Sequence, residues 1–221
     1  MPNSAKIKSL KKGVFIVFEG GEGTGKSTQI RKMEALLKQK GFDVIVTWEP
    51  GGTPLGERVR HILLDPSSGK MDARCEALLY SAARAEHVAK VIRPALDRNA
   101  VVLCDRYCDA SRAYQGAGRG LGMKAIDQLN CWATQDLSPD RVYLFDIAPE
   151  AGLERAKVRN EGTLDRLEQE PLDFHNQIRK AYLFIAQSDP ARYRMIDSRG
   201  GIEEIHQKLL ADIEPMIEAN G

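Results

Sequence analysis

The chain has 221 residues, with 32 lysines and arginines against 31 aspartates and glutamates, which gives a net charge of +1. This length is enough for one well-buried domain. The balanced charge argues against nonspecific DNA binding and against attachment to an anionic membrane, because both usually need a marked basic excess.

The first residues do not fit a secretory signal. Residues 1–12 are basic, and the apolar run that follows, 13–18, is too short for a signal and far too short for a membrane span. We expect a cytoplasmic protein that binds neither membrane nor nucleic acid. In it, residues 1–12 form a mobile tail and residues 13–221 a single domain.

The four cysteines, Cys75, Cys104, Cys108 and Cys131, form no C-x-x-C pair and have no nearby histidine at zinc-ligand spacing. We expect reduced thiols with structural roles, as in most cytoplasmic proteins. Cys104 and Cys108 flank a predicted active-site turn, which leaves a redox role open without further support.

Apolar, β-rich runs alternate with amphipathic segments along the chain. The predicted strands are 14–18, 43–48, 100–104, 141–145 and 192–196. The predicted helices are 29–41, capped by Gly41, then 73–92, ending or kinking near Pro94, and 123–133, 149–158, 171–187 and 201–218. Nearly continuous apolar strands indicate a parallel sheet covered on both faces. We therefore expect an α/β protein with three layers, a five-stranded parallel sheet flanked by helices.

The stretch FEGGEGTGKST (18–28) places the pattern G-x-x-x-x-G-K-S between a predicted strand and a predicted helix. Glycines let the backbone wrap closely, so that N–H groups and the positive end of the helix attract phosphate. Lys26 is expected to reach the β- and γ-phosphates, and the Ser27 hydroxyl to bind Mg²⁺. A chance match in a glycine-rich turn is the alternative, and the strand and helix in register argue against it. Glu22 lies inside this loop, where phosphate should repel it.

A phosphate loop defines only the donor side of a reaction. It serves GTPases, motor ATPases and kinases with small acceptors alike. The guanine-binding motif N-K-x-D is absent from the sequence, which argues against a GTPase.

The apolar strand 100–104 runs into Asp105 and Arg106. An acid at the carboxyl edge of the sheet lies near the phosphate loop, where Mg²⁺ or its waters need a ligand. The adjacent arginine can bind a second phosphate group with two hydrogen bonds. A strand-end ion pair is the structural alternative. Asp146 also ends a strand, but no basic residue follows it, so it ranks well below Asp105.

Five segments then occur in one order: the phosphate loop, EPGGTPLGE (49–57), LLYSAAR (78–84), DRYCDASRAYQG (105–116) and LDRLEQE (164–170). Together they resemble bacterial thymidylate kinases, which transfer the γ-phosphate of ATP to dTMP. The resemblance spans nearly the whole chain after residue 12. It implies a P-loop kinase fold with a short lid at about 155–168. It also implies a Mg²⁺-dependent reaction that gives ADP and dTDP for dTTP biosynthesis, and a homodimer.

The resemblance implies roles for the matching residues. Tyr80 and Arg84, four apart on one helix face, would stack on thymine and donate to its carbonyl. By residue type alone, a core tyrosine and a solvated arginine would be expected. Tyr114 would crowd a ribose 2′-hydroxyl, Arg106 would bind the dTMP phosphate, and Glu22 would accept a hydrogen bond from the dTMP 3′-hydroxyl.

The full set of implied site residues falls into four groups. The ATP-binding residues are Gly20, Gly21, Glu22, Gly23, Thr24, Gly25, Lys26, Ser27, Thr28, Arg155 and Arg159. The dTMP-binding residues are Glu22, Glu49, Pro50, Tyr80, Arg84, Arg106, Ser111, Tyr114, Gln115, Arg166 and Glu168. The catalytic residues are Lys26, Asp105, Arg106 and Arg159, and the metal ligands are Ser27 and Asp105.

The segment 154–170 is dense in charge, which in most proteins marks a solvated surface. The phosphate loop contains no arginine, so the cation that stabilises the transferred phosphoryl group should come from elsewhere, and the resemblance implies the lid. We favour Arg159, with Arg155 and Arg166 as alternatives. Glu168 could position the lid or the acceptor, and lid closure would exclude water.

Trp48 departs from the family pattern, in which an arginine commonly precedes EPGG. Either that arginine is dispensable or Arg58 or Arg60 substitutes for it. Two other functions stay open. One is a kinase of the same fold that acts on another pyrimidine nucleotide or on a deoxynucleoside. The other is a P-loop ATPase switch with a protein partner, which would hydrolyse ATP slowly whatever the acceptor.

Overall fold

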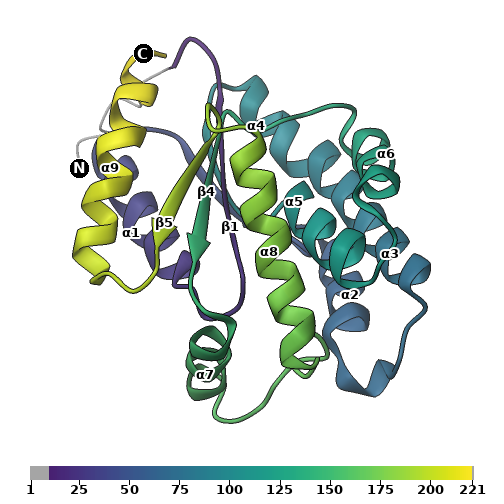
Figure 1. Cartoon of the computed structure of the whole chain (residues 1–221). Helices are drawn as coiled ribbons and strands as arrows, with labels where there is room; N and C mark the ends of the chain where they lie inside the picture. Colours follow the sequence, from purple (N-terminus) through teal and green to yellow (C-terminus); the bar gives the residue numbers. More distant parts are fainter. Residues whose placement is uncertain (1–9, 221) are drawn as a thin grey trace.

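The computed structural model of the chain describes residues 10–220, which fold around a five-stranded parallel sheet (Figure 1). The strands are β1 (Val14–Gly20), β2 (Val44–Trp48), β3 (Val101–Asp105), β4 (Arg141–Asp146) and β5 (Tyr193–Asp197). Their order is β2-β3-β1-β4-β5, and every neighbouring pair is parallel. The predicted α/β class, the three layers and the five strands are confirmed.

Helices precede and follow the strands along the chain. They are α1 (Lys26–Gln39), α2 (Pro54–Leu64), α3 (Ala73–His87), α4 (Arg93–Asp97), α5 (Cys108–Ser111), α6 (Met123–Thr134), α7 (Pro149–Arg159), α8 (Leu172–Ser188) and α9 (Ile202–Glu218). Two π-helical segments, η2 (Val88–Ile92) and η3 (Arg112–Gly118), and one short 3₁₀ turn, η1 (Pro66–Ser68), complete the helical part.

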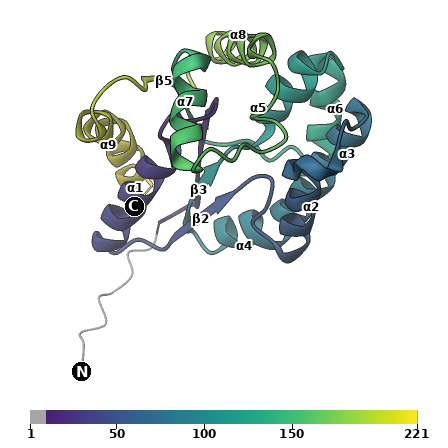
Figure 2. The same ribbon diagram turned by 90° about the horizontal axis from the view of Figure 1, so that it is seen from below.

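The sheet separates two apolar cores, because successive side chains of a strand point to opposite faces. In β1, Phe15 and Val17 belong to the core shared with α2, α3 and α8, whereas Ile16 belongs to the core shared with α1 and α9. Figure 2 shows α1 and α9 on one side of the strands and α3 and α8 on the other. Both faces of the sheet are thus covered, and its edge at the carboxyl ends of the strands is left for a site.

The ends of two predicted helices show how local sequence acts. The cap predicted at Gly41 is confirmed: its φ is +90°, Gly41 N donates to Lys38 O, and Phe42 N donates to Leu37 O, the pattern that closes a helix with glycine. The helix predicted over 73–92, ending or kinking near Pro94, is regular in α3 as far as His87, passes through the π-helical turn η2 and continues as α4 to Asp97. The widened turn η2 directly before α4 accommodates a residue that has no N–H to donate.

Two helical regions were missed by the sequence analysis. Helix α2 has a readable signal: Thr53 Oγ1 accepts from Gly56 N at 2.9 Å as the N-cap, and Pro54 takes the first helical position. The region formed by α5 and η3 has no such signal, since η3 is π-helical and departs from the usual helical period.

The tail boundary expected at residue 12 needs correction. Residues 1–9 lie outside the described part of the chain. Leu10, however, is buried in the core beside α1 and α9, and Lys11 N donates to Asn220 O at 2.6 Å. The chain therefore packs against the domain before residue 13.

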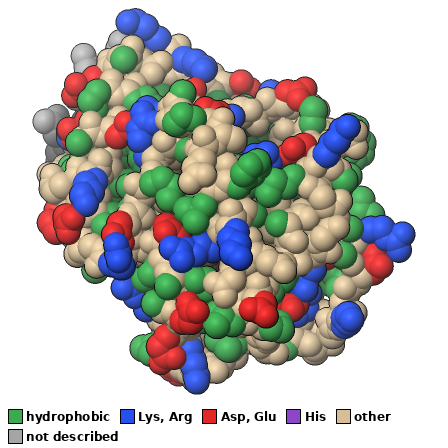
Figure 3. Space-filling view, viewed as in Figure 1, with side chains coloured by type: hydrophobic (Ala, Val, Ile, Leu, Met, Phe, Trp, Pro, Cys, Tyr) green, Lys and Arg blue, Asp and Glu red, His purple; other side chains and the backbone are tan. Residues whose placement is uncertain are grey.

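The surface agrees with the balanced charge. Figure 3 shows acidic and basic side chains interspersed with apolar ones over the face that carries α7, α8 and α9. Within residues 10–220, no helix combines the length and apolar character needed to cross a bilayer.

Candidate active site

The phosphate loop connects the end of β1 to the start of α1. Gly23 and Gly25 have φ angles of +61° and +88°, a left-handed backbone that side chains disfavour. A Cβ at Gly23 would lie 2.0 Å from the backbone oxygen of Gly152 in α7. Glycine is therefore required at Gly23 both by the loop conformation and by the close approach of α7.

Lys26 lies inside this loop. Its Nζ donates to the backbone oxygens of Gly20 and Gly21 at 3.1 and 3.0 Å and to Thr24 Oγ1 at 3.3 Å. Burial, and then the charge of Arg106, lower the pKa of Lys26 to about 8. The loop itself thus places the ammonium beside a helix N-terminus, where phosphate is favoured.

Ser27 and Asp105 meet at the carboxyl edge of the sheet. Asp105 ends β3, which pairs in parallel with β1, and Ser27 lies in the first turn of α1. Ser27 Oγ donates to Asp105 Oδ2 at 3.0 Å. A hydroxyl and a carboxylate are the oxygen ligands that Mg²⁺ prefers, so the donor set fits this metal.

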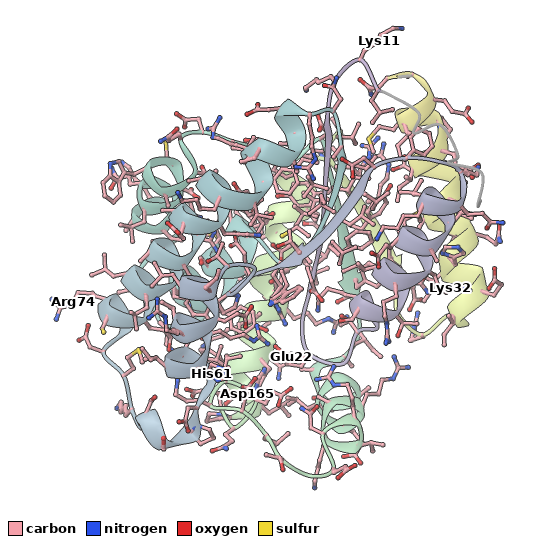
Figure 4. The ribbon with its side chains drawn as sticks, turned by 180° about the vertical axis from the view of Figure 1, so that it is seen from behind. Lys11, Glu22, Lys32, His61, Arg74 and Asp165 are labelled. Atoms are coloured by element: carbon pink, nitrogen blue, oxygen red, sulfur yellow. The ribbon has the colours of Figure 1, made fainter. Side chains whose placement is uncertain are left out.

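Glu22 is held by two residues from outside the loop. Its Oε1 accepts from Arg106 Nη2 and from Tyr114 OH, both at 2.7 Å. Burial alone would raise the pKa of Glu22, but the charges of Arg106 and Lys26 outweigh it and lower the pKa to about 2. The carboxylate is therefore ionised. Figure 4 shows Glu22 at the sheet edge near Asp165, a residue of the segment that follows α7, and both residues line one cavity.

Two cavities meet at the pair of Glu22 and Arg106. The first, the acceptor cavity, is lined by Glu22, Glu49, Pro50, Arg60, Leu64, Tyr80, Arg84, Arg106, Ala110, Tyr114, Gln115, Asp165 and Leu167. The second, the donor cavity, is lined by Glu22, Gly23, Thr24, Gly25, Lys26, Ser27, Thr28, Ile30, Arg31, Val46, Thr47, Trp48, Glu49, Glu57, Arg60, Asp105, Arg106, Arg155 and Arg159. Gly20 and Gly21 line neither of these two cavities; their carbonyl oxygens accept from Lys26 Nζ.

Three of the residues predicted to bind dTMP line neither cavity. Ser111 is buried and accepts from Arg84 Nη2 at 3.1 Å. Arg166 donates to Leu63 O at 2.7 Å and pairs with Glu76 Oε2 at 2.7 Å. Arg166 therefore anchors the segment after α7 to α2 and α3.

The third, Glu168, accepts from the backbone N–H of Asp165 at 3.1 Å and so shapes the same segment. Asp165 is the residue of this segment that reaches the acceptor cavity, and the sequence analysis missed it. The sequence feature that could have indicated Asp165 is its position directly before Arg166 in LDRLEQE. Burial raises the pKa of the Asp165 carboxyl.

Arg155 and Arg159 of α7 both line the donor cavity but differ in their bonds. Arg155 Nη1 donates to Ser198 O at 3.0 Å. Arg159 has a side chain that is 59% exposed, and it contacts Asn160 Oδ1 at 3.1 Å and Glu168 Oε1 at 3.4 Å. Exposed contacts of this kind are weak, so Arg159 can leave them for a phosphate at small cost.

Trp48 lines the donor cavity, and its Nε1 donates to Glu57 Oε1 at 2.9 Å. Of the two arginines considered as substitutes for the missing one, Arg60 borders both cavities and donates to Pro50 O at 2.9 Å. Arg58 is exposed and lines neither cavity. Of these two arginines, Arg60 is therefore the one placed to substitute for the arginine that commonly precedes EPGG.

Arg84 is fully buried, whereas residue type alone predicts a solvated side chain. Its Nε donates to Glu49 Oε2 and its Nη1 to Asn130 Oδ1, both at 2.6 Å. Its Nη2 donates to Tyr107 O and Ser111 Oγ. A guanidinium has five N–H groups, so within residues 10–220 one Nη1 N–H is left to face the acceptor cavity.

Asp146 is engaged by a residue distant in sequence. Arg179 of α8 donates to both of its carboxylate oxygens, at 2.7 and 2.8 Å. Asp146 lines neither the donor nor the acceptor cavity. Its carboxylate is thus held by a structural ion pair outside both cavities.

Glu19, at the end of β1, is a buried carboxylate that the sequence analysis missed. It accepts from Tyr107 N and from Tyr182 OH, both at 2.8 Å, and Tyr182 OH in turn accepts from Arg106 Nη1 at 3.3 Å. Burial, and then the charge of Asp109, raise the pKa of Glu19 to about 7. No motif marked Glu19, because its partners lie in other parts of the chain.

The phosphate loop lies at the carboxyl edge of a parallel sheet, and Arg106 borders both the donor cavity at this loop and the acceptor cavity beside it. This arrangement defines a P-loop phosphotransferase with a small acceptor. The family model described as thymidylate kinase matches residues 18–209. The chain belongs to the thymidylate kinase family.

Individual relatives agree with this assignment. The chain is 49% identical over 206 residues to a thymidylate kinase of Pseudomonas putida, covering 93% of this chain and 97% of that one. It is 46% identical over 202 residues to one of Syntrophotalea carbinolica, covering 88% and 92%. The crystal structure of thymidylate kinase from Ehrlichia chaffeensis superposes with a TM-score of 0.74 at 31% identity, covering 90% and 97%.

Proposed function

We propose that the chain transfers the γ-phosphate of ATP to dTMP, forming ADP and dTDP for dTTP biosynthesis. The observation that carries this proposal is that Glu22 and Arg106 border both the donor and the acceptor cavity. The phosphates of ATP in one cavity and of dTMP in the other would face each other there. Phosphoryl transfer requires such a roughly in-line arrangement of attacking and leaving oxygens.

Charge stabilisation would come from residues already placed around the donor cavity. Lys26 would exchange the loop carbonyls for the β- and γ-phosphates, and Arg106 would bind the acceptor phosphate. Arg159, the more weakly held arginine of α7, would neutralise charge on the transferred group. The acceptor phosphate is already an anionic nucleophile, so no residue is needed as a base.

Mg²⁺ would be held by Ser27 and Asp105, whose oxygens lie 3.0 Å apart in the donor cavity. ATP and water would supply its other ligands, which is usual for this ion. When bound, the ion neutralises charge on the phosphate oxygens. Asp105, which accepts from Ser27 Oγ, would organise this corner of the site.

The acceptor cavity suits a deoxynucleotide. Tyr80 offers an aromatic face and Arg84 one N–H to a base. Within the described residues 10–220, both side-chain hydrogen bonds to Glu22 end on Oε1, which leaves Oε2 to accept from a 3′-hydroxyl. The Tyr114 ring lies beside Arg106, in the position to crowd a 2′-hydroxyl.

We also propose that the protein works as a homodimer in the cytoplasm. Ile62 of α2, Leu78 of α3 and Trp132 of α6 are 48%, 57% and 84% exposed, and α3 packs against both α2 and α6. Large apolar side chains on adjoining helices favour contact with a second copy. The four free cysteines suit a reducing compartment.

The test is ADP release with Mg²⁺-ATP across dTMP, dUMP, dCMP, UMP, AMP and thymidine. The expected result is turnover strongest with dTMP. Turnover with another acceptor only would keep the kinase and overturn the acceptor assignment. Slow ADP release that ignores every acceptor would instead indicate an ATPase switch.

A further inference from the structure

We propose that Glu76 determines base specificity by fixing the side-chain amide of Gln115, so that the acceptor cavity takes a 4-oxo pyrimidine and rejects a 4-amino pyrimidine. The inference deepens the proposed function and rests on it, since it concerns the base of the nucleotide in the acceptor cavity. Glu76 itself does not line that cavity and would act through Gln115.

Glu76 of α3 is a buried acceptor held by three side chains. Its Oε1 accepts from Gln115 Nε2 at 2.8 Å and from Arg119 Nε at 3.2 Å. Its Oε2 accepts from Arg119 Nη2 at 3.1 Å and pairs with Arg166 Nη2 at 2.7 Å. Glu76 is 0% exposed, so these partners take the place of water.

The two guanidinium groups keep this carboxylate ionised. Burial alone would raise the pKa of Glu76, but hydrogen bonds from Arg119 and Gln115 and the nearby charges outweigh it and lower the pKa. An ionised carboxylate accepts hydrogen bonds and donates none. The amide nitrogen of Gln115 must therefore face Glu76, because the amide oxygen would meet a second acceptor there.

The opposite atom of the amide is then fixed as well. Gln115 is 1% exposed and borders the acceptor cavity. Among residues 10–220, none donates to Gln115 Oε1, which leaves this oxygen as an acceptor for a ligand. Turning the amide over would break the bond to Glu76 and set the amide oxygen against the carboxylate without a donor between them, at a cost typical of unsatisfied polar groups.

The cavity therefore presents an acceptor and a donor to the base. Gln115 Oε1 is the acceptor, and the remaining N–H of Arg84 is the donor. A 4-oxo pyrimidine such as thymine offers the complementary pair, an N3–H and an O4. Cytosine offers a bare N3 and an amino group at C4, which opposes both.

The test compares dTMP with 5-methyl-dCMP, which keeps the methyl group and changes only the N3 and C4 edge. We expect wild-type kcat/KM to be lower for 5-methyl-dCMP by at least about 100-fold, because buried polar groups would be left unpaired. Comparable use of both nucleotides by the wild-type protein would overturn the inference, whatever any variant does. No turnover with either nucleotide would instead overturn the proposed function.

Glu76→Gln is the informative variant, since its own amide can donate to Gln115 and permit the amide of Gln115 to turn over. We expect the ratio of kcat/KM for 5-methyl-dCMP to that for dTMP to rise by about tenfold or more. Glu170→Gln is the matched control, because it removes the outer partner of Arg119, at 2.6 Å, and leaves Glu76 unchanged. Equal losses for both nucleotides in Glu76→Gln would show a structural role only and would overturn the assignment.

Discussion

Glu22 Oε1 lies 2.7 Å from Arg106 Nη2, so a residue inside the phosphate loop is paired with the arginine that follows β3. Because β1 and β3 are parallel neighbours, the loop and the turn that carries Arg106 emerge at the same edge of the sheet. A carboxylate that phosphate would repel is in this way compensated from the opposite side.

The first prediction concerns this pair. Glu22→Gln should raise the KM for dTMP by about ten- to a hundredfold, because the hydrogen bond from the 3′-hydroxyl to a charged carboxylate is worth about 1.5–3 kcal/mol. The KM for ATP should change much less. Lys26, which would bind the ATP phosphates, is positioned by the carbonyl oxygens of Gly20 and Gly21 and not by the Glu22 side chain. Steady-state kinetics with each substrate varied in turn gives both values. A change confined to the KM for ATP would place Glu22 on the donor side.

The second prediction separates two arginines of the charged segment. Arg159→Ala should lower kcat by about 10³-fold or more, with little change in dTMP affinity, because a positioned arginine stabilises the phosphoryl charge. A kcat near that of the wild type would show that another residue supplies this charge.

Arg166→Ala is the comparison for that variant. It removes a buried partner of Glu76, so we expect a loss of about 3–5 kcal/mol in the free energy of unfolding. Urea denaturation of both variants measures this. A larger loss of stability in Arg159→Ala than in Arg166→Ala would contradict the assignment.

The third prediction is a pH dependence of stability from Glu19. Its pKa in the folded chain is about 7, above the ordinary 4.5, so folding favours the protonated form. Its contribution to stability is present below pH 4.5 and is lost as the pH rises through 7. Glu19→Gln should therefore gain on the wild type between pH 5 and pH 8, by at most about 3 kcal/mol, since one pKa unit is about 1.4 kcal/mol. Urea denaturation at four pH values measures the difference between the two chains. A difference that stays constant with pH would show that Glu19 titrates alike in both states.

The fourth prediction concerns the proposed dimer. Trp132→Glu should reduce the molar mass seen in light scattering towards that of one chain, because the side chain is 84% exposed and its loss disturbs no core. Phe184→Glu on α8 is the matched control, an exposed aromatic residue on another helix. Equal masses for the two variants, both dimeric, would exclude α6 from the interface.

The sequence predicted most of what local pattern determines. The strands, the glycine cap of α1 and the phosphate loop follow from runs and spacings of neighbouring residues. Tyr80 and Arg84 were assigned to the acceptor side only through the family resemblance, because residue type alone favoured a core tyrosine and a solvated arginine; both line the acceptor cavity. The same reasoning misjudged Arg166, whose charge lies in a solvent-like segment of sequence but is buried against Glu76.

The residues that were missed share one physical cause. Glu19 and Glu76 take part in no spacing that marks an ion pair or a ligand, and their partners come from other helices and loops. No local period contains such pairs, because they form only when the sheet and the helices pack. Buried carboxylates of this kind are found from the fold, not from the sequence.

Helix α3 carries Tyr80 and Arg84 into the acceptor cavity and turns Leu78 outward. In a dimer of the proposed kind, helix α3 would line the base pocket and also contact the neighbouring subunit. Dilution, which separates subunits, would then also loosen the pocket. The specific activity would then decrease as the enzyme is diluted. Because α3 would serve both the pocket and the interface, the measured kcat would depend on how much of the protein is dimeric.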